Sequence, residues 1–387
     1  MEDNGSKKGA AMLPETSIWT YFADLEDPRS EQNRDHPLVN VIMIAILGVI
    51  CGADGWVDIE RYGKAKQEWL ATFLDLEHGI PSHDTFGRVF RWLDEAAFQA
   101  CFINWTASLC EQTHGQLVAL DGKKLRRSQD RRKDRDSIWM VSAWASANRI
   151  VLGQKKVDDK SNEITAIPAL LAQLDITGCV VTLDALNTQT AIARQIIEAK
   201  ADYILAVKKN QGTLYQDLEM LFDGFASENY RQVLYQTAQR ENTGHDRQEF
   251  RQIWVVSEPD YRQYLRRGEQ WPQLTSLIKL VTVRNTPQKT EMTTRYFISS
   301  WQASAHAFLA AIRDHWQIEN GLHWVLDIAF REDESRIRKD HAPQNMALLR
   351  HLALNLLKQE PSVKVGIAAK RKMAGWDNDY LLKVVCP

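Results

Sequence analysis

The stretch LVALDGKKLRRS, residues 117–128, marks the point at which the sequence changes from a helical to a β pattern. Four apolar residues run into Asp121, a glycine follows, and the next five positions hold two lysines and two arginines. A short apolar run bounded by turn residues is typical of a buried strand. We therefore expect a strand that ends on a carboxylate, and the cations around this carboxylate need an explanation.

Downstream of Asp121, segments with strand and helix patterns alternate. Apolar, β-branched runs predict further strands, and spacing of apolar residues at three and four predicts helices between them. The strands are expected at 138–146, 149–157, 179–185 and 202–208, and the helices at 163–174 and 188–200. Three strands followed by helix, strand, helix and strand describe an α/β domain with a mixed sheet.

A second kind of pattern interrupts this domain. After a helical lead-in, residues 212–300 contain four segments rich in β-branched and aromatic residues, which predict a β-rich insertion. Helical spacing returns over residues 305–330. The α/β core is therefore expected to comprise residues 114–211 and 301–358.

Upstream, helical spacing dominates residues 16–113, which we expect to form an all-helical N-terminal domain. Turn-forming stretches at 26–37 (EDPRSEQNRDHP) and 77–84 (EHGIPSHD) separate its helices. The ends of the chain are expected to be a disordered leader over 1–15 and a basic tail over 359–387.

Composition bounds the class of protein. A chain of 387 residues with 44% hydrophobic and 25% charged residues is typical of a globular protein with two or three domains. Five scattered cysteines without CxxC spacing argue against a disulfide framework and a zinc site, and fit a reducing, cytoplasmic compartment. The net charge of −2 does not exclude a nucleic-acid partner, which requires only a local positive surface.

The most apolar stretch, LVNVIMIAILGVICGA at 38–53, is 16 residues long. A helix needs about 20 such residues to cross a bilayer. We therefore expect a buried helix here and no membrane partner.

Two carboxylates follow predicted strands: Asp121 ends the first, and Asp184, in VVTLDALNTQ, ends the fourth. Ligands of open α/β sheets gather at the carboxyl ends of strands. If these two strands are neighbours, about 4.8 Å apart, their carboxylates can share hard cations such as Mg²⁺. An aspartate after a strand is also a common turn former or helix cap, which is the favoured reading for either residue alone. Together on one sheet edge they favour a metal site.

A third metal ligand is expected from the segment HWQIENGLH, where Glu319 is the candidate. On a regular helix His315, Glu319 and His323 lie on one face. The plainer alternative is that Glu319 pairs with one of two half-buried histidines. A zinc site is a weaker alternative, because the HExxH arrangement is missing.

Cations are dense after Asp121: residues 122–136 hold eight Lys or Arg against three Asp. A solvated loop is the common alternative, but directly after a metal-binding acid this density favours a track for a phosphate backbone. The candidate contacts are Lys123, Lys124, Arg126, Arg127, Lys208, Lys209, Arg331, Arg336, Arg338 and Lys339.

The segment PSHDTFGRVFRWLD at 81–94 resembles the reading helix of a helix-turn-helix motif. Ser82 is a plausible N-cap, and an apolar face can pack on the core. A plain packing helix remains the alternative. The side chains left available for DNA are His83, Thr85, Arg88 and Arg91.

Several longer strings together resemble one known family, the H-repeat-associated insertion-sequence transposases of bacteria, within the DDE superfamily. The strings are LDGKKLRRS, SNEITAIPALLAQLDITGCVVTLDA, DYILAVKKNQGTL, RYFISS, HWQIENGLHWVLDIAFREDESRIR and RHLALNLLK. The helical start, with LEDPRSEQNRDHPL and GIPSHDTFGRVF, is similar to the domain associated with that family. The resemblance extends from about Trp19 to Leu382.

The resemblance implies a ribonuclease-H-like mixed-sheet core with a β-rich insertion before the last catalytic helix. It implies that Asp121, Asp184 and Glu319 hold two Mg²⁺ ions, or Mn²⁺, and that DNA strands are cut and transferred. The wider group usually has an Arg shortly before the Glu and a Lys two turns after it, where this chain has His315 and Leu326. His315 therefore joins the candidate DNA contacts.

The resemblance further implies double-stranded DNA as partner, at the element ends and the target, and a homodimer on that DNA. The alternative function is a transposase-derived DNA-binding protein without cleavage activity. A nuclease that cuts without joining also remains open.

Overall fold

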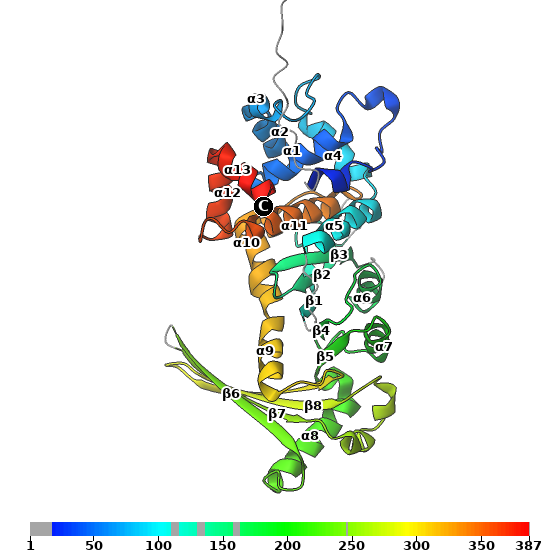
Figure 1. The fold of residues 1–387 in the computed structure, drawn as a ribbon, viewed down its shortest axis with the longest axis vertical. Coiled ribbons are helices and arrows are strands. Elements are labelled where there is room, and N and C mark those ends of the chain that lie inside the picture. Colours follow the sequence, from blue (N-terminus) through cyan, green and yellow to red (C-terminus); the bar gives the residue numbers. More distant parts are fainter. Residues whose placement is uncertain (1–17, 110–115, 130–135, 158–162, 245–246, 387) are drawn as a thin grey trace, which may run out of the picture.

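A nine-stranded sheet runs through the molecule, with the strand order β3-β2-β1-β4-β5-β9-β8-β7-β6 (Figure 1). The computed structural model describes residues 18–109, 116–129, 136–157, 163–244 and 247–386.

The first five strands form the α/β core. Strand β1 pairs antiparallel with β2 and parallel with β4, while β4 pairs parallel with β5. The strands are β1 (Leu117–Lys124), β2 (Trp139–Ala145), β3 (Ile150–Lys156), β4 (Val180–Leu183) and β5 (Asp202–Val207). Helices α6 (Glu163–Leu171) and α7 (Thr190–Glu198) connect them in the order that the sequence predicts. The expected fold class, a ribonuclease-H-like mixed sheet behind a helical start, is confirmed.

The two faces of this core sheet bury different helices because successive side chains of a strand point to opposite faces. Val118 and Leu120 of β1 pack in the same apolar cluster as α6 and α7. Leu117 and Val180 instead pack with Phe308 of helix α9 (Ala305–His315), on the other face. Helix α9 therefore lies against the face opposite to α6 and α7.

The segment between β5 and α9 begins with helix α8 (Gly212–Ser227) and continues with four long strands. They are β6 (Tyr235–Gly244), β7 (Arg247–Val256), β8 (Ser276–Asn285) and β9 (Thr290–Ser299). Strand β9 pairs antiparallel with β5, so the β-rich insertion extends the core sheet and is not a separate sheet. Figure 1 shows these strands curving away beneath α9.

The N-terminal helices pack around α1 (Leu38–Ile50), whose residues are almost all buried. The others are α2 (Trp56–Ala65), α3 (Gln67–Leu70), α4 (His83–Trp92) and α5 (Glu95–Leu109). Within the described residues, the segment Glu31–Ile50 passes the length and composition test for a membrane span, but 67% of its apolar window is buried inside the protein. A helix that is apolar on all sides and enclosed by others is a core helix, as the sequence predicts.

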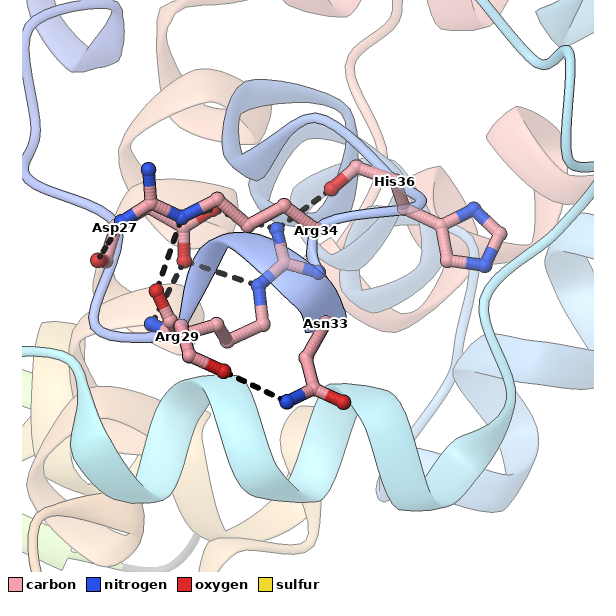
Figure 2. A network of polar contacts seen from close by, with 6 residues as sticks. Asp27, Arg29, Asn33, Arg34 and His36 are labelled. Carbon is pink, nitrogen blue, oxygen red and sulfur yellow. Dashed lines mark hydrogen bonds and ion pairs between the residues drawn. The ribbon is translucent and has the colours of Figure 1, made fainter.

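The loop before α1 is held by Arg29, which is only 6% exposed. Figure 2 shows its guanidinium group against the Asp27 carboxylate, with Nε and Nη2 donating at 2.9 and 2.7 Å. Nη2 also donates to the carbonyl of His36, and Arg34 donates back to the carbonyl of Arg29. These bonds fix residues 27–36 as a compact turn without regular structure of its own beyond the short turn Glu31–Asn33.

The last part of the chain consists of packed helices. After α9 come a π-helical turn (Ile318–His323), α10 (Trp324–Phe330), α11 (Ala342–Gln359), α12 (Ile367–Trp376) and α13 (Asn378–Val385). The expected basic tail over 359–387 is thus two helices, whose Ala374, Leu381 and Val384 join the core around α1. Two of its cations, Lys370 and Arg371, are buried, and Arg371 donates to the carbonyl of Val49 at the end of α1.

Candidate active site

Asp121 lies on β1, and Asp184 directly follows the neighbouring strand β4. Leu120 of β1 lies opposite Leu183, the last residue of β4, in a parallel pair, and an aspartate is the next residue of each segment. Their position on neighbouring strands, on which the sequence argument depended, is therefore present. Asp121 does not end its strand, however, because β1 continues to Lys124 by pairing with β2. The apolar run gave no sign of this polar extension.

Glu319 lies in the π-helical turn that follows α9. The N–H of Trp324 donates to the carbonyl of Glu319, a five-residue step in place of the four of an α-helix. Lys358 of α11 anchors the turn by donating to the carbonyl of Gly321 at 2.7 Å. A regular helix with His315, Glu319 and His323 on one face was expected, and the wider turn replaces that geometry.

The two histidines contact the strands and not Glu319. His315 Nδ1 lies 2.9 Å from Thr182 Oγ1 on β4, and His323 Nδ1 lies 3.5 Å from Asp121 Oδ2. Burial lowers the pKa of each histidine to about 4. Both rings are therefore neutral at pH 7, and His315 shares a hydrogen bond with Thr182. The alternative in which Glu319 pairs with a histidine is wrong for this structure.

Negative charge accumulates around Asp121. Burial raises its pKa to about 7, a hydrogen bond from Gly122 opposes the rise, and the carboxylates of Asp184, Glu163 and Glu319 add to it. Neighbouring carboxylates raise one another's pKa. Their oxygens are the ligands that a hard cation prefers. The donor set therefore fits Mg²⁺.

A complete metal cage is not preformed. Among the described residues, no three His, Cys, Asp or Glu side chains stand close enough together to hold an ion. Mg²⁺ keeps several waters and needs only one or two protein carboxylates, so the fit rests on the chemistry of the donors.

Glu163 and Asn187 also belong to this site, and the sequence argument missed both. Asn187 Nδ2 donates to Glu163 Oε2 at 3.2 Å and to Asp184 Oδ1 at 2.8 Å, which ties the two carboxylates together. Glu163 begins α6 and presses on Gly122, where a Cβ atom would fall 2.2 Å from its Oε1. The glycine directly after Asp121 was the available signal, because it leaves room for this carboxylate.

Lys123 has an internal role in the structure. Its ammonium group lies 2.5 Å from Asp327 Oδ1 and 2.7 Å from Glu332 Oε2, and its side chain is 12% exposed. The partner of Asp327 is thus Lys123. Glu332 is itself buried beside Arg350, at 3.7 Å. Lys123, two residues after Asp121 on β1, is therefore held in an ion-pair network with Asp327 and Glu332.

The other candidate cations remain at the surface. Arg126 pairs with Asp333 at 3.1 Å, and Arg338 donates to the carbonyl of Arg127. Lys208 lines a small pocket that also contains Asp184. The exposed set is Lys124, Arg126, Arg127, Lys208, Lys209, Arg331, Arg336, Arg338 and Lys339. The four remaining cations of the 122–136 run, Arg131, Arg132, Lys133 and Arg135, lie outside the described residues.

Helix α4 has the predicted cap and apolar face. Ser82 Oγ accepts a hydrogen bond from the N–H of Thr85, and Phe86, Val89 and Phe90 are buried. Arg88 is exposed and lines a hollow of about 370 Å³ between α4 and the turn of Figure 2. Arg91 instead forms an ion pair with Asp340. Arg88 is therefore freer to meet DNA than Arg91.

Comparison with known proteins agrees with this arrangement. Residues 19–106 match the DDE_Tnp_1-associated family model, and residues 105–356 match the model of the transposase DDE domain. The chain is 37% identical over 372 residues to "H repeat-associated putative transposase YhhI" of Escherichia coli strain K12, covering 95% of this chain and 97% of that protein. It is 38% identical over 374 residues to "Putative transposase YncI" of E. coli O157:H7, covering 95% and 94%.

Two more distant likenesses complete the comparison. A 54-residue stretch, 14% of this chain and 64% of the relative, is 44% identical to "Inactive transposase YbfQ" of E. coli strain K12. A cryo-EM structure of a piggyBac transposase synaptic complex with hairpin DNA aligns over 95% of this chain and 79% of that chain. Its TM-score of 0.43 and 10% identity are too low to carry a conclusion. The two family models and the near full-length relatives suffice, and the chain belongs to the DDE transposases related to the H-repeat-associated proteins.

Proposed function

We propose that the chain is the working transposase of a bacterial insertion sequence. It cuts DNA at the ends of the element and joins the freed strands to target DNA by in-line attack on phosphodiesters. The observation that carries this proposal is the position of Asp121 on β1 beside Asp184 at the end of the paired strand β4, with the carboxylates of Asp184 and Glu319 both raising the pKa of Asp121. Such reactions require positioning and charge neutralisation more than covalent catalysis.

In this proposal Asp121, Asp184 and Glu319 hold two Mg²⁺ ions, for which Mn²⁺ can substitute. Bound ions of this kind activate a water or 3′-hydroxyl nucleophile and stabilise the leaving oxygen. The chain's own groups orient the ligands: Asn187 binds Asp184, and the neutral His323 ring binds Asp121. Glu163 is a fourth carboxylate that adjusts the charge of the site.

The proposed partner is double-stranded DNA, at both the element ends and the target, in a reducing cytoplasm. Cutting two ends of one element requires two active sites, for which we propose a homodimer on DNA. Helix α4 reads bases through Arg88. Phosphates are contacted by the exposed cations Lys124, Arg126, Arg127, Lys208, Lys209, Arg336 and Arg338. His315, which contacts Thr182 of β4, assists them.

A matched pair of variants tests the metal assignment: Glu319→Gln and Asp327→Asn. Glu319 is exposed at the site, so we expect its substitution to abolish Mg²⁺-dependent nicking with little change in melting temperature. Asp327 pairs with Lys123, so its substitution should lower the melting temperature and leave much of the nicking. Both are measured on one DNA substrate with Mg²⁺ and with EDTA.

The result decides between the two functions. A stably folded, inactive Asp327→Asn beside an active Glu319→Gln would reverse the assignment of the third acid. Wild-type protein that binds the DNA but never nicks it would favour a transposase-derived binding protein without cleavage activity.

A further inference from the structure

A large groove of the described protein lies on other elements than the basic run that follows Asp121. It is a groove of about 930 Å³ between the extended strands β6–β9 and the end of helix α9. Three carboxylates line it, Glu249, Glu291 and Asp314. Six arginines also line it: Arg240, Arg247, Arg251, Arg284, Arg295 and Arg313.

The strand register explains how these arginines come to share one surface. Ala238, Ile253 and Leu280 lie beside one another across β6, β7 and β8 and pack in the apolar cluster of α9. Arg240 and Arg251 pair with each other two residues further along the same strands. Because side chains alternate between faces, they lie on the same face as that apolar bed. The sheet face is therefore apolar under α9 and cationic beyond it.

The charges of the groove do not balance. Buried Glu249 is shared by three arginines, Arg251 at 2.8 Å, Arg284 at 3.4 Å and Arg247 at 3.7 Å. Burial lowers the pKa of Arg251, and Arg313, Arg247 and Arg284 lower it further, against the opposing effect of Glu249. A guanidinium group surrounded by others of its kind lies in a positive potential.

Two of the arginines have their donors available. Arg240 and Arg313 are exposed, and within the described part of the chain neither guanidinium group has a hydrogen bond or ion pair. Arginine binds phosphate oxygens through paired N–H groups and cannot be neutralised near pH 7. Free guanidinium groups in a positive groove suit a polyanion.

The groove leads to the carboxylate site. A smaller pocket of about 120 Å³ contains Asp184 and shares Ile312, Arg295 and Trp316 with the groove. The Arg295 guanidinium lies 5.3 Å from the centre of the Trp316 ring, which is 40% exposed. An extended polyanion bound in the groove can therefore continue past Arg295 and Trp316 to Asp184. Figure 1 shows α9 meeting the strands β6–β9, the elements that carry the lining residues of the groove.

We propose that this groove binds the sugar-phosphate backbone of duplex DNA that leads into the Asp184 site. The inference rests on the proposed function for its choice of partner, but its own support is the register, the charge and the connection to Asp184. Phosphates held by several arginines release counterions, so binding here must weaken steeply with salt. The proposed DNA-binding surface thus includes a sheet face whose arginines are scattered in the sequence and form no basic run.

The test compares full-length wild type with the double variant Arg240→Gln/Arg313→Gln. Arg194→Gln is the matched control, because Arg194 is an exposed arginine of α7 on the opposite side of the sheet. Fluorescence anisotropy measures binding of a labelled duplex from the chain's flanking genomic DNA over a series of KCl concentrations. Each lost phosphate contact should weaken binding by roughly tenfold at ~0.1 M salt and reduce the log–log salt slope by about 1. Arg194→Gln should bind as wild type does.

Equal affinity and salt slope for wild type and the double variant, both with unchanged circular dichroism and melting temperature, would overturn the inference while leaving the proposed function intact. Tighter binding of the single strand than of the duplex would overturn the duplex assignment. Wild type that binds no duplex at all would remove both this inference and the proposed DNA partner. If wild type binds the duplex through these arginines but does not nick it, only the proposed function is contradicted.

Discussion

Asp121 illustrates how much one residue's surroundings decide. It lies on β1, which is paired with β2 and β4; its carboxyl group is 3.5 Å from His323 Nδ1 and near three other carboxylates, and burial raises its pKa to about 7. The unfolded value is 3.8. The folded, metal-free protein therefore retains a proton on Asp121 that the unfolded chain has lost at pH 5 or 6.

This shift predicts a pH-dependent effect of Asp121→Asn on stability. A raised carboxyl pKa contributes stability that is fully present below about pH 4 and is lost as the pH rises through about 7. Metal-free wild type and Asp121→Asn should therefore melt alike at pH 4, while the variant should melt higher at pH 8, by about 5 °C. Scanning calorimetry with EDTA measures this. Added Mg²⁺ should raise the melting temperature of wild type only, and a difference that is constant with pH would contradict the shifted pKa.

Lys123 and Lys124 are neighbours in sequence with different expected roles. Lys123→Ala leaves the buried Glu332 without its nearest cation, so we expect a loss of about 3–5 kcal/mol in the free energy of unfolding. Lys124 is exposed and lies 5.8 Å from the Trp139 ring, so Lys124→Ala should cost less than about 1 kcal/mol. Urea denaturation compares them. Similar losses for both would show that the network around Lys123 does not stabilise the fold.

At the residue scale the sequence could identify the carboxylates but not their partners. Asp121 and Asp184 follow apolar runs, a pattern that is local and visible. The contact of Lys123 with Asp327 and Glu332 joins residues about two hundred positions apart, so no spacing rule reaches it. Asn187 lies only three residues after Asp184, yet its bond to Glu163 depends on how α6 meets the sheet.

Elements show the same division between local pattern and tertiary packing. Apolar periodicity predicts α1, the core strands and the two crossover helices because each buries one face or all of its surface. Periodicity does not reveal the π-helical turn at Glu319, since one widened turn leaves the apolar spacing on either side unchanged. Nor does it reveal that residues 359–387 form two docked helices, because their buried Lys370 and Arg371 look like surface cations in sequence.

Helix α4 carries the prediction at this scale. Arg88 projects from a helix whose opposite face is buried, so Arg88→Ala should leave stability unchanged within about 0.5 kcal/mol. If Arg88 reads a base, binding to element-end DNA should weaken by about 1–3 kcal/mol and binding to random DNA much less. Competition assays with both duplexes measure the difference. Equal weakening on the two would mean a phosphate contact and not base reading.

For the whole molecule, one sheet connects the parts that the sequence separates. The residues described as an insertion continue the core sheet through β9, so the arginine groove and the acids lie on one continuous scaffold. The sequence indicated the insertion's β content but not its pairing with β5, because strand order is set by long-range contacts. The helical start and the C-terminal helices share a core around α1 and close the far end of the molecule.

The central claim is that these parts together perform metal-dependent DNA cutting and joining. The most direct measurement incubates purified wild type and Asp184→Asn with the chain's own flanking genomic DNA and a target plasmid, with Mg²⁺ or with EDTA, and resolves nicked and joined products. We expect wild type with Mg²⁺ to give both products at the element ends, and Asp184→Asn or EDTA to give neither while DNA binding persists. Equal nicking and joining by Asp184→Asn, or by wild type in EDTA, would contradict the account.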